Sequence, residues 1–411
     1  MTEYYDELET RDPEAREAAL MAALPDAIAH ARTHAPGFAA ILADVAPQEV
    51  TSRAALAALP VTRKSDLIER QQAEPPFGGL TATPPRELKR LFLSPGPIAD
   101  PEGHGADWWR FARALFAAGF RSRDILHNCF AYHFTPAGAM FETAAHALGC
   151  AVVAGGTGQT EMQVEAIAHF GADGFAGTPD FLKIVLDKSQ EMGVLLPTLK
   201  KACVSGGALF PSLRQEIRSH GVDVLQCYGT ADLGLIAYES EALDGMILDE
   251  SLIVEILRPG TGNPVPDGEV GEVVVTTLNR DYPLVRFATG DLSAVLPGPS
   301  PCGRTAPRIK GWMGRADQTT KVKGMFVHPA QIDRVVKRTP EVLRARLVVD
   351  SRDGKDVATL VCESASGDES LSERVEQAVQ SECKLRVAVR IVAPNTIAND
   401  GKVIEDDRDF S

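Results

Sequence analysis

The sequence predicts an α/β protein. A large N-terminal domain, with parallel or mixed sheets covered by helices, would carry a small β subdomain and be followed by a small α+β domain. Between residues 125 and 226, short apolar runs alternate with helical periodicity, which is typical of a parallel sheet covered on both faces. Residues 252–278 are strand-like throughout, and a polar connector that ends at residue 324 precedes a last α+β pattern.

The chain begins with a helical region. Apolar residues recur at helical spacing from residue 12 to residue 34, and shorter helices are expected at 52–59 and 65–69. A charged, proline-rich stretch at 74–85 separates them from the alternating region. There we expect strands at 125–130, 150–154, 174–176, 202–205 and 222–226, with helices at 137–148, 160–169, 179–192 and 211–220. Ligands bind such sheets beyond the carboxyl ends of the strands.

The strand-like region contains the segment PGTGNPVPDG, whose Gly, Pro and Asn residues predict a hairpin turn. We expect a β subdomain at about 234–312 and a hinge within 314–324. The N-terminal domain would then cover 1–316 and the C-terminal domain 317–411. The last domain should contain helices at 329–337 and 369–382 and strands at 345–349, 357–362 and 387–392.

Composition excludes several classes of protein. The 411 residues carry a formal net charge of −14, which argues against nucleic acid or an anionic membrane as a partner. No apolar run approaches the roughly 20 residues of a membrane helix, and the N-terminus lacks the layout of a signal peptide. The seven scattered cysteines are typical of reduced thiols in a cytosolic protein. We therefore expect a cytoplasmic protein.

The segment SGGA (Ser205, Gly206, Gly207, Ala208) leaves an expected strand and precedes a helix. Its glycines allow a ligand to approach the backbone closely, and a helix N-terminus favours anions. The same pattern is also typical of an ordinary turn between a strand and a helix.

The segment YGTAD (Tyr228 to Asp232) ends the next expected strand. Its aromatic ring can stack on a base, the hydroxyl of Thr230 can bind phosphate, and the carboxylate of Asp232 can hold a divalent cation. A buried tyrosine followed by a helix cap is the alternative.

Four further residues can bind a nucleotide. Asp291 ends a strand-like run and can accept hydrogen bonds from a ribose diol, although a turn aspartate is equally typical. Arg286 and Arg315 can pair with phosphate or with surface carboxylates. Lys402 lies in a polar loop, where a lysine is usually solvated.

Taken in order, the segments SGGA, YGTAD, YPLVRFATGD, CGRTAPRI, GRADQTTKVKG and a terminal GK resemble the adenylate-forming superfamily of acyl-CoA synthetases over nearly the full chain. The phenylacetate-CoA ligase family is the most similar branch. The resemblance implies a small mobile C-terminal lid that rotates about Asp317. It also implies a reaction in two steps, in which a carboxylic acid and Mg-ATP give an acyl-adenylate and CoA then releases AMP.

The resemblance also implies roles for individual residues. Gly206 and Gly207 would line the adenine pocket, with Tyr228 stacked on the base. Asp291 would hold the ribose hydroxyls, with Arg315 nearby. The remaining residues that the motifs place around the nucleotide are Ser205, Ala208, Gly229 and Arg286.

For the chemical steps, the resemblance places Lys402 at the carboxylate and the α-phosphate. Asp232 stands where the family has a metal-binding glutamate, and Thr230 can supply the hydroxyl that Ala231 lacks. Lys323 would belong to the face that meets CoA, although a solvated lysine is an equal alternative.

The acyl pocket should lie beneath the adenylate, between two short segments of the chain. Aromatic and small residues there suit a flat, apolar acid, although they are equally typical of core filling. The residues concerned are Tyr132, His133, Phe134, Pro136, Ala137 and Gly138 on one wall and Gly177, Thr178 and Pro179 on the other.

The sequence departs from the family at the phosphate-binding loop, which here reads SPGPIADPEG (94–103). Its prolines remove N–H donors, the lysine is absent, and Asp100 and Glu102 should repel a triphosphate. Near Cys302 no second thiol or histidine has convincing spacing, so we expect no zinc.

These features predict an ATP-dependent CoA ligase for an aromatic or arylacetic acid that uses ATP, Mg²⁺ and CoA. One alternative is a nucleotide- or acyl-CoA-binding homologue without adenylation, and another is an adenylating enzyme with a different acceptor. A homodimer is left open.

Overall fold

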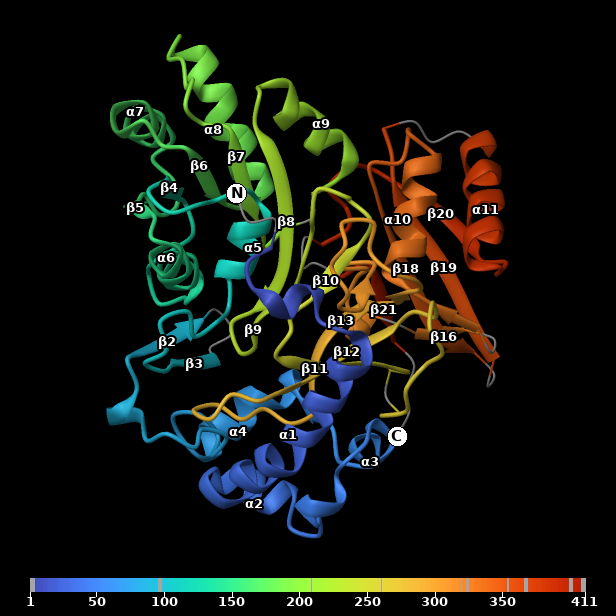
Figure 1. Ribbon diagram of the computed structural model, residues 1–411. Coiled ribbons are helices and arrows are strands. Elements are labelled where there is room, and N and C mark those ends of the chain that lie inside the picture. Colours follow the sequence, from blue (N-terminus) through green and yellow to red (C-terminus); the bar gives the residue numbers. More distant parts are fainter. Residues whose placement is uncertain are drawn as a thin grey trace. The chain divides into compact units, whose positions relative to one another are not determined.

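The structure is a computed structural model that describes residues 4–94, 98–207, 209–259, 261–318, 320–322, 325–352, 355–365, 369–398 and 402–407 (Figure 1). It divides into two compact units. The large unit comprises Met1–Thr289 and Ala294–Trp312, and the small unit comprises Gly290–Ser293 and Met313–Ser411.

Helices form the N-terminal part of the large unit, as expected. In α1, Asp12 accepts a hydrogen bond from the backbone N–H of Ala15, and Pro13 occupies the first helical position, where no N–H is needed. Leu20, Leu24 and Ile28 recur every four residues and face the core. The elements are η1 (Glu7–Thr10), α1 (Pro13–His34), α2 (Pro36–Ile41), η2 (Pro47–Glu49), α3 (Arg53–Ala57), η3 (Lys64–Asp66), α4 (Leu67–Ala73) and η4 (Pro85–Glu87).

The centre of the large unit is a nine-stranded mixed sheet with the order β14-β15-β10-β9-β8-β7-β6-β4-β5. Its five alternating strands are parallel, which confirms the predicted α/β class. They are β4 (Ile125–Asn128), β5 (Ala151–Ala154), β6 (Gly174–Gly177), β7 (Lys201–Val204) and β8 (Asp223–Thr230). Between them run α6 (Ala137–Leu148), α7 (Thr160–Phe170), α8 (Pro179–Glu191) and α9 (Pro211–Ser219), and α5 (Ala112–Ala117) precedes β4.

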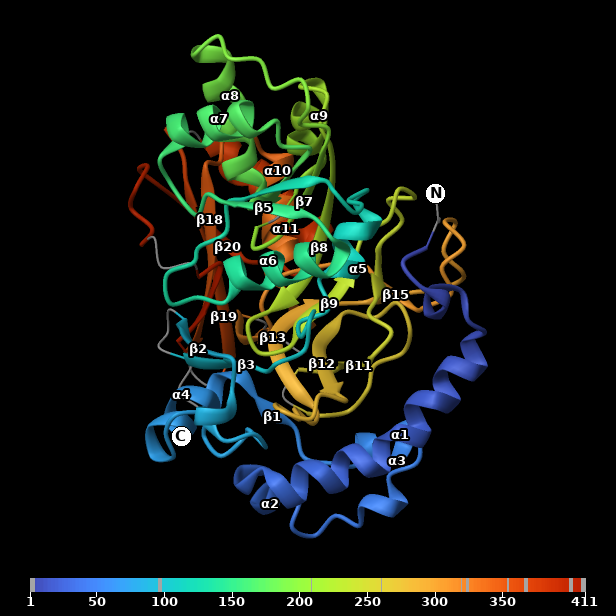
Figure 2. The same ribbon diagram turned by 60° about the vertical axis from the view of Figure 1, so that its left-hand side comes forward.

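Neighbouring residues of a strand point to opposite faces, and both faces of the inner strands β6 and β7 are buried, whereas the edge strand β5 is partly exposed. On β7, Ala202 and Val204 pack with the residues of α7, α8 and α9, which lie at one end of the sheet in both views (Figure 2). Cys203 packs instead with the cluster that contains α6. The chain passes from β4 outward to β5 and then back to β6 on the other side of β4, and such a switch in strand order is where α/β sheets bind ligands.

The strands expected in the β subdomain are shared between two sheets. Four of them extend the nine-stranded sheet: β9 (Gly234–Tyr238), β10 (Met246–Leu248), β14 (Val295–Leu296) and β15 (Arg308–Ile309). The others, β11 (Leu252–Leu257), β12 (Gly271–Thr277) and β13 (Phe287–Ser293), form a four-stranded sheet with β1 (Thr62–Arg63), in the order β1-β13-β12-β11. β11 and β12 form the expected antiparallel hairpin. A separate hairpin contains β2 (Arg90–Ser94) and β3 (Ile98–Glu102).

The small unit is an α+β module with its own apolar core, drawn in orange and red in Figure 1. Its main sheet has the order β20-β19-β18-β21, and α10 and α11 pack against each other. The elements are η5 (Ala316–Gln318), β16 (Thr320–Val322), β17 (Met325–Val327), α10 (Pro329–Arg338), β18 (Arg344–Arg352), β19 (Lys355–Glu363), α11 (Glu369–Cys383), β20 (Ala388–Val392) and β21 (Ile404–Asp406). In the part of the chain that the structure describes, no helix combines the length and the apolar character needed to cross a membrane.

Candidate active site

A pocket of about 190 Å³ opens in the large unit at the carboxyl ends of the parallel strands. It is built by the end of β8 and by segments that follow β4, β7 and β8, together with α6, the start of α5 and the end of β2. Ligands of α/β sheets bind at this edge. The lining residues are Ser94, Phe111, Phe130, Thr135, Pro136, Ala137, Met140, Phe141, Ser205, Gly206, Gly229, Thr230 and Ala231.

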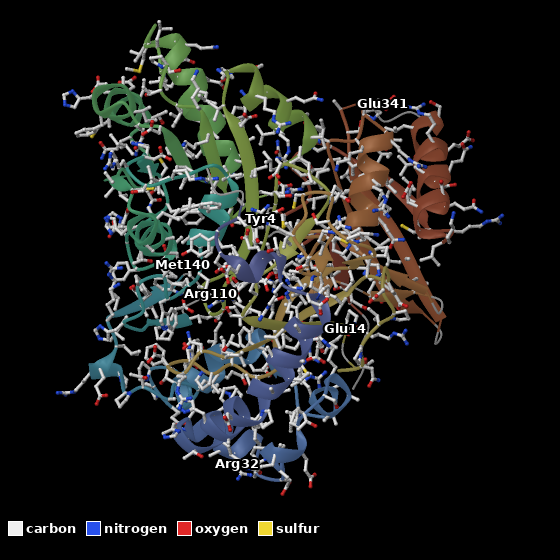
Figure 3. All side chains as sticks on the ribbon, in the orientation of Figure 1. Tyr4, Glu14, Arg32, Arg110, Met140 and Glu341 are labelled. Carbon is white, nitrogen blue, oxygen red and sulfur yellow. The ribbon has the colours of Figure 1, made fainter. Side chains whose placement is uncertain are left out.

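One wall of the pocket is aromatic. The rings of Phe130 and Phe141 are stacked with centroids 4.4 Å apart, and the ring of Phe111 lies 4.8 Å from that of Phe141. Ala137, Met140 and Phe141 share one face of α6 because they are three and four residues apart, and Met140 is labelled in Figure 3. No sequence motif contains Phe111, Phe130 or Phe141, although the helical spacing from Ala137 points to Met140 and Phe141.

The opposite wall contains small and hydroxyl-bearing residues. Ser205 Oγ donates a hydrogen bond to the carbonyl of Cys227 at 2.8 Å, and Thr230 Oγ1 accepts one from the N–H of Leu233 at 3.1 Å. A Cβ atom on Gly229 would lie 2.5 Å from the carbonyl oxygen of Gly234, so only glycine fits. None of the described residues that line the pocket carries a charge.

Of the nine residues expected to form the acyl pocket, Pro136 and Ala137 line it. Tyr132 is half-buried and its hydroxyl accepts a hydrogen bond from Asn128 Nδ2, while His133 and Phe134 point to solvent. The other four have structural surroundings: Gly138 bonds to Ala131, Gly177 packs against Phe175, Thr178 caps α8 and Pro179 begins α8.

The expected nucleotide ligands lie in different places. Gly206 lines the pocket with a φ of +70°, which glycine adopts without strain, whereas Gly207 lies against Pro179. Tyr228 is buried beside the pocket wall, and its hydroxyl donates to Thr289 Oγ1 at 3.3 Å. Ala208 lies outside the described residues.

Other candidates belong to the small unit. Asp291 and Arg315 form an ion pair at 3.2 Å, so the structure brings these two residues together. Lys402 is exposed, with its ammonium 3.8 Å from a carboxylate oxygen of Glu405. Lys323 and the side chain of Asp317 lie outside the described residues.

Arg286 requires a correction, because its side chain is buried inside the large unit instead of facing a ligand. Its Nε donates to Glu255 at 3.0 Å, and its other nitrogens donate to Glu255 and to backbone carbonyls, including that of Gly262. The backbone φ of +44° at Arg286 is unusual for a residue with a side chain. Arg286 therefore joins β11 to β13 and is not part of the pocket.

The hairpin of β2 and β3 also differs from the expectation that its acids repel phosphate. Asp100 and Glu102 are both buried. Glu102 is paired with Lys89 and Arg90, and Asp100 accepts a hydrogen bond from Ser94 Oγ at 3.0 Å. The two carboxyl groups therefore point into the protein and do not present charge to a ligand.

Asp100 belongs to a buried polar cluster beside the pocket. Lys64 Nζ lies 2.6 Å from Asp232 Oδ2, and Asp232 directly follows the lining residue Ala231. Burial and the charge of Asp232 raise the pKa of the Asp100 carboxyl to about 8. Burial and the two nearby carboxyl groups also raise the pKa of the Tyr282 hydroxyl.

A bound Mg²⁺ prefers octahedral coordination by six oxygen ligands, and the residues of this cluster offer few of them. Asp232 offers one oxygen, Oδ1, that has no hydrogen-bond partner within the described structure, and its other oxygen already contacts Lys64. Among the described residues, no group of three or more His, Cys, Asp or Glu side chains could hold a metal ion. The residues do not fit a divalent ion held by the chain alone.

The raised pKa of Asp100 predicts a pH-dependent stability. The folded state keeps a proton up to pH of about 8. The unfolded state releases it near pH 4, so the free energy of unfolding should fall by up to about 1.4 kcal/mol per pH unit between these values. Asp100→Asn should remove this contribution, and urea unfolding at pH 5, 6.5 and 8 should show a growing advantage of the variant. A difference that does not change with pH would contradict the prediction.

Two family models match the chain. The model of the AMP-binding enzymes matches residues 106–279, and the model of the AMP-binding enzyme C-terminal domain matches residues 324–406. The first range contains most of the pocket, and the second lies in the small unit.

Similar proteins agree with these matches. The phenylacetate-coenzyme A ligase of Thermus thermophilus is 30% identical over 399 residues, which cover 91% of this chain and 88% of the relative. The ligase of the same name from Aromatoleum evansii is 30% identical over 75% of this chain and 72% of its own. An open conformation of 2-hydroxyisobutyryl-CoA ligase, solved with 2-HIB-AMP and CoA, has a TM-score of 0.86 at 25% identity and covers 99% of this chain and 95% of its own.

The order of the motifs, the pocket at the ends of the parallel strands and these similarities lead to one conclusion. The chain belongs to the family of AMP-binding, adenylate-forming enzymes that includes the phenylacetate-coenzyme A ligases.

Proposed function

We propose that this protein is an ATP-dependent acid–thiol ligase. A carboxylate oxygen of the acid attacks the α-phosphorus of ATP, the bond to pyrophosphate breaks, and an acyl-adenylate forms. The thiol of CoA then attacks the acyl carbon, loses its proton and displaces AMP. The observation that carries the proposal is the pocket in which an aromatic wall meets the SGG and YGT segments.

The pocket supports a compact aromatic or arylacetic acid that carries no charged group besides its carboxylate. Its volume of about 190 Å³ is modestly larger than an engineered cavity of roughly 150 Å³ that binds benzene, so one ring with one or two further carbons fits. The stacked rings of Phe130 and Phe141 offer a flat apolar surface. A second ionised group on the acid would find no counter-charge among the described lining residues.

Roles for the other candidate residues belong to this proposal. Gly206 and Thr230 contact the adenylate from the pocket wall, and Tyr228 supports that wall from behind. Asp291, oriented by Arg315, holds the ribose. Lys402 neutralises the charge that develops between the carboxylate and the α-phosphate.

The setting of the reaction is also proposed. Mg²⁺ enters as the complex with ATP, bound by phosphate oxygens. The enzyme works in the cytoplasm, where ATP and CoA are available and where its seven free thiols remain reduced. A homodimer is the proposed assembly, and light scattering of the purified protein would measure its mass.

Acid-dependent ATP–pyrophosphate exchange tests the proposal. A panel should contain benzoate, phenylacetate, a bicyclic aromatic acid, a dicarboxylic acid and a long-chain fatty acid. We expect exchange with the single-ring acids and an acyl-CoA product by mass spectrometry when CoA is added. Absence of exchange with every acid would refute the proposal, and an acyl product without CoA dependence would indicate another acceptor.

A second function is favoured by the β2–β3 hairpin. The loop lacks the lysine of the family's phosphate-binding loop, and its prolines remove N–H donors that could bind the β- and γ-phosphates. The alternative function is therefore that of a homologue that binds AMP or acyl-CoA without adenylation. Calorimetry distinguishes the two functions, because this one requires binding of AMP or acyl-CoA with weak binding of Mg-ATP.

Ala137→Phe should impair use of the acid by filling the pocket from α6. We expect the KM for the acid to rise about 10- to 100-fold, the equivalent of about 1–3 kcal/mol of steric conflict. The KM for ATP should change little. Ala147→Phe is the matched control, since Ala147 lies on the exposed side of the same helix. Equal kinetics for the two variants would place the acid elsewhere.

A further inference from the structure

Lys64 was not part of any motif in the sequence, yet it contacts a candidate site residue. It begins η3, directly after β1, and its ammonium lies 2.6 Å from Asp232 Oδ2. The Asp232 carboxylate is buried, whereas the Lys64 side chain is 26% exposed. A buried carboxylate requires a positive partner, and Lys64 supplies it.

The surroundings of this ion pair add polar groups but no second cation in the described structure. Asp100 and Tyr282 both lie close enough to Asp232 to interact electrostatically with it. Asp100 Oδ1, Asp232 Oδ1 and the Tyr282 hydroxyl are buried, and no hydrogen bond to them is found within the described residues. Nearby Glu102 is already balanced by Lys89 and Arg90. Lys64 is thus the cation that the described structure provides for Asp232.

The ion pair is continuous with the pocket. Thr230 and Ala231 line it, and Asp232 is the next residue. Thr230 Oγ1 also accepts a hydrogen bond from the N–H of Leu233, so a hydrogen bond connects the residues on either side of Asp232 in the turn from 230 to 233. A shift of the Asp232 carboxylate would therefore move the pocket wall.

We propose that Lys64 is the resident cation of this site: its ammonium, instead of a divalent ion held by the chain, balances Asp232 and positions the turn that lines the pocket. Lys64 is a positioning residue that acts through Asp232. The ion pair and the turn are features of the structure itself. The inference rests on the proposed function only in naming the ligands that bind in the pocket.

Two chemical consequences follow. An ammonium at 2.6 Å occupies one carboxylate oxygen and cancels its charge, so a divalent ion without nucleotide gains little from Asp232. A cation that belongs to the chain also remains in place when pyrophosphate leaves, so the Asp232 carboxylate stays balanced during the second half-reaction.

Titration with Mn²⁺ in the absence of nucleotide tests the inference, because the free ion gives an electron paramagnetic resonance signal that disappears on binding. Wild-type protein and Asp232→Asn should give the same signal of free Mn²⁺, which means that neither protein binds the ion. Lys64→Met should bind Mn²⁺ weakly but measurably, because both oxygens of Asp232 then lack their counter-ion. Lys64→Arg should restore the wild-type result, and the double variant with Lys64→Met and Asp232→Asn should lose the bound ion.

One bound Mn²⁺ in the wild type that is lost in Asp232→Asn would overturn the inference, and so would a folded Lys64→Met that binds none. If Lys64→Met does not fold, wild type and Asp232→Asn still test the inference. Equal signals of free Mn²⁺ in these two proteins support it, and unequal signals refute it. The titration contains no acid, ATP or CoA. Its failure is therefore distinguishable from failure of the proposed ligase activity.

Discussion

Replacing Lys402 with alanine should lower acid-dependent ATP–pyrophosphate exchange by about 10²- to 10³-fold, the range found when one electrostatic donor to a developing charge is removed. The physical reason is that adenylation joins a carboxylate to a phosphate, two anions that repel until a cation lies between them. Thioester formation from supplied acyl-adenylate and CoA should change only a few-fold, because that step builds no such charge.

Glu405→Gln is the matched control for this experiment. It removes the carboxylate 3.8 Å from the Lys402 ammonium but leaves the ammonium itself. Exchange in this variant should stay within a few-fold of the wild type, because the Lys402 ammonium is kept. Circular dichroism should check its fold, because Glu405 also pairs with the buried Arg346 at 3.2 Å. Full exchange in Lys402→Ala, or an equal loss in both half-reactions, would remove Lys402 from the proposed first step.

Glu9→Ala should produce the largest loss of stability, with a fall of about 3–5 kcal/mol in the free energy of unfolding. The Glu9 side chain is fully buried. It accepts hydrogen bonds from Arg113 at 3.1 Å, from Tyr238 at 3.0 Å and from Arg304 at 2.9 Å. Alanine would leave two buried guanidinium groups without this shared partner.

Urea unfolding followed by circular dichroism measures this loss. Glu7→Ala is the control, because Glu7 lies two residues away in the same short helix and is exposed. We expect its free energy of unfolding to stay within about 0.5 kcal/mol of the wild type. Similar losses in both variants would mean that the helix, and not the buried network, determines the effect.

The hydrogen bonds of Glu9 also give a structural role to the CGRT segment, which in the sequence alone is only a sign of the family. Arg304 belongs to the CGRT segment, and its guanidinium is buried against Glu9. Burial opposes its charge, but Glu9 and other partners raise the pKa of Arg304 overall. The motif therefore joins the N-terminal segment to the end of the central sheet.

The alternation of strands and helices was predictable because each element carries its own periodicity. The residues of β7 illustrate this, since every one of them is apolar or lies at a strand end and both faces are covered. The family was predictable because its motifs occur in a fixed order along the chain, and the comparisons confirm it. Gly206 and Thr230, chosen from two of those motifs, lie in the same pocket.

Partners distant in the sequence were not predictable in this way. Arg286 looked like a phosphate ligand, but Glu255 on another strand binds it in the interior. Phe134 looked like a pocket residue and is exposed, whereas Phe111, from a segment without a motif, lines the pocket. A side chain's type restricts the chemistry it can perform, but its neighbours decide whether that chemistry faces a ligand.

The sequence by itself determined the α/β class, the family and the two turns at the carboxyl ends of β7 and β8, because these depend on local periodicity and on motif order. Only the tertiary structure decided which aromatic rings form the pocket, that Asp100 and Glu102 turn inward, and that Lys64 balances Asp232. The physical reason is that burial and charge balance arise from contacts between segments far apart in the chain, and no local pattern records them.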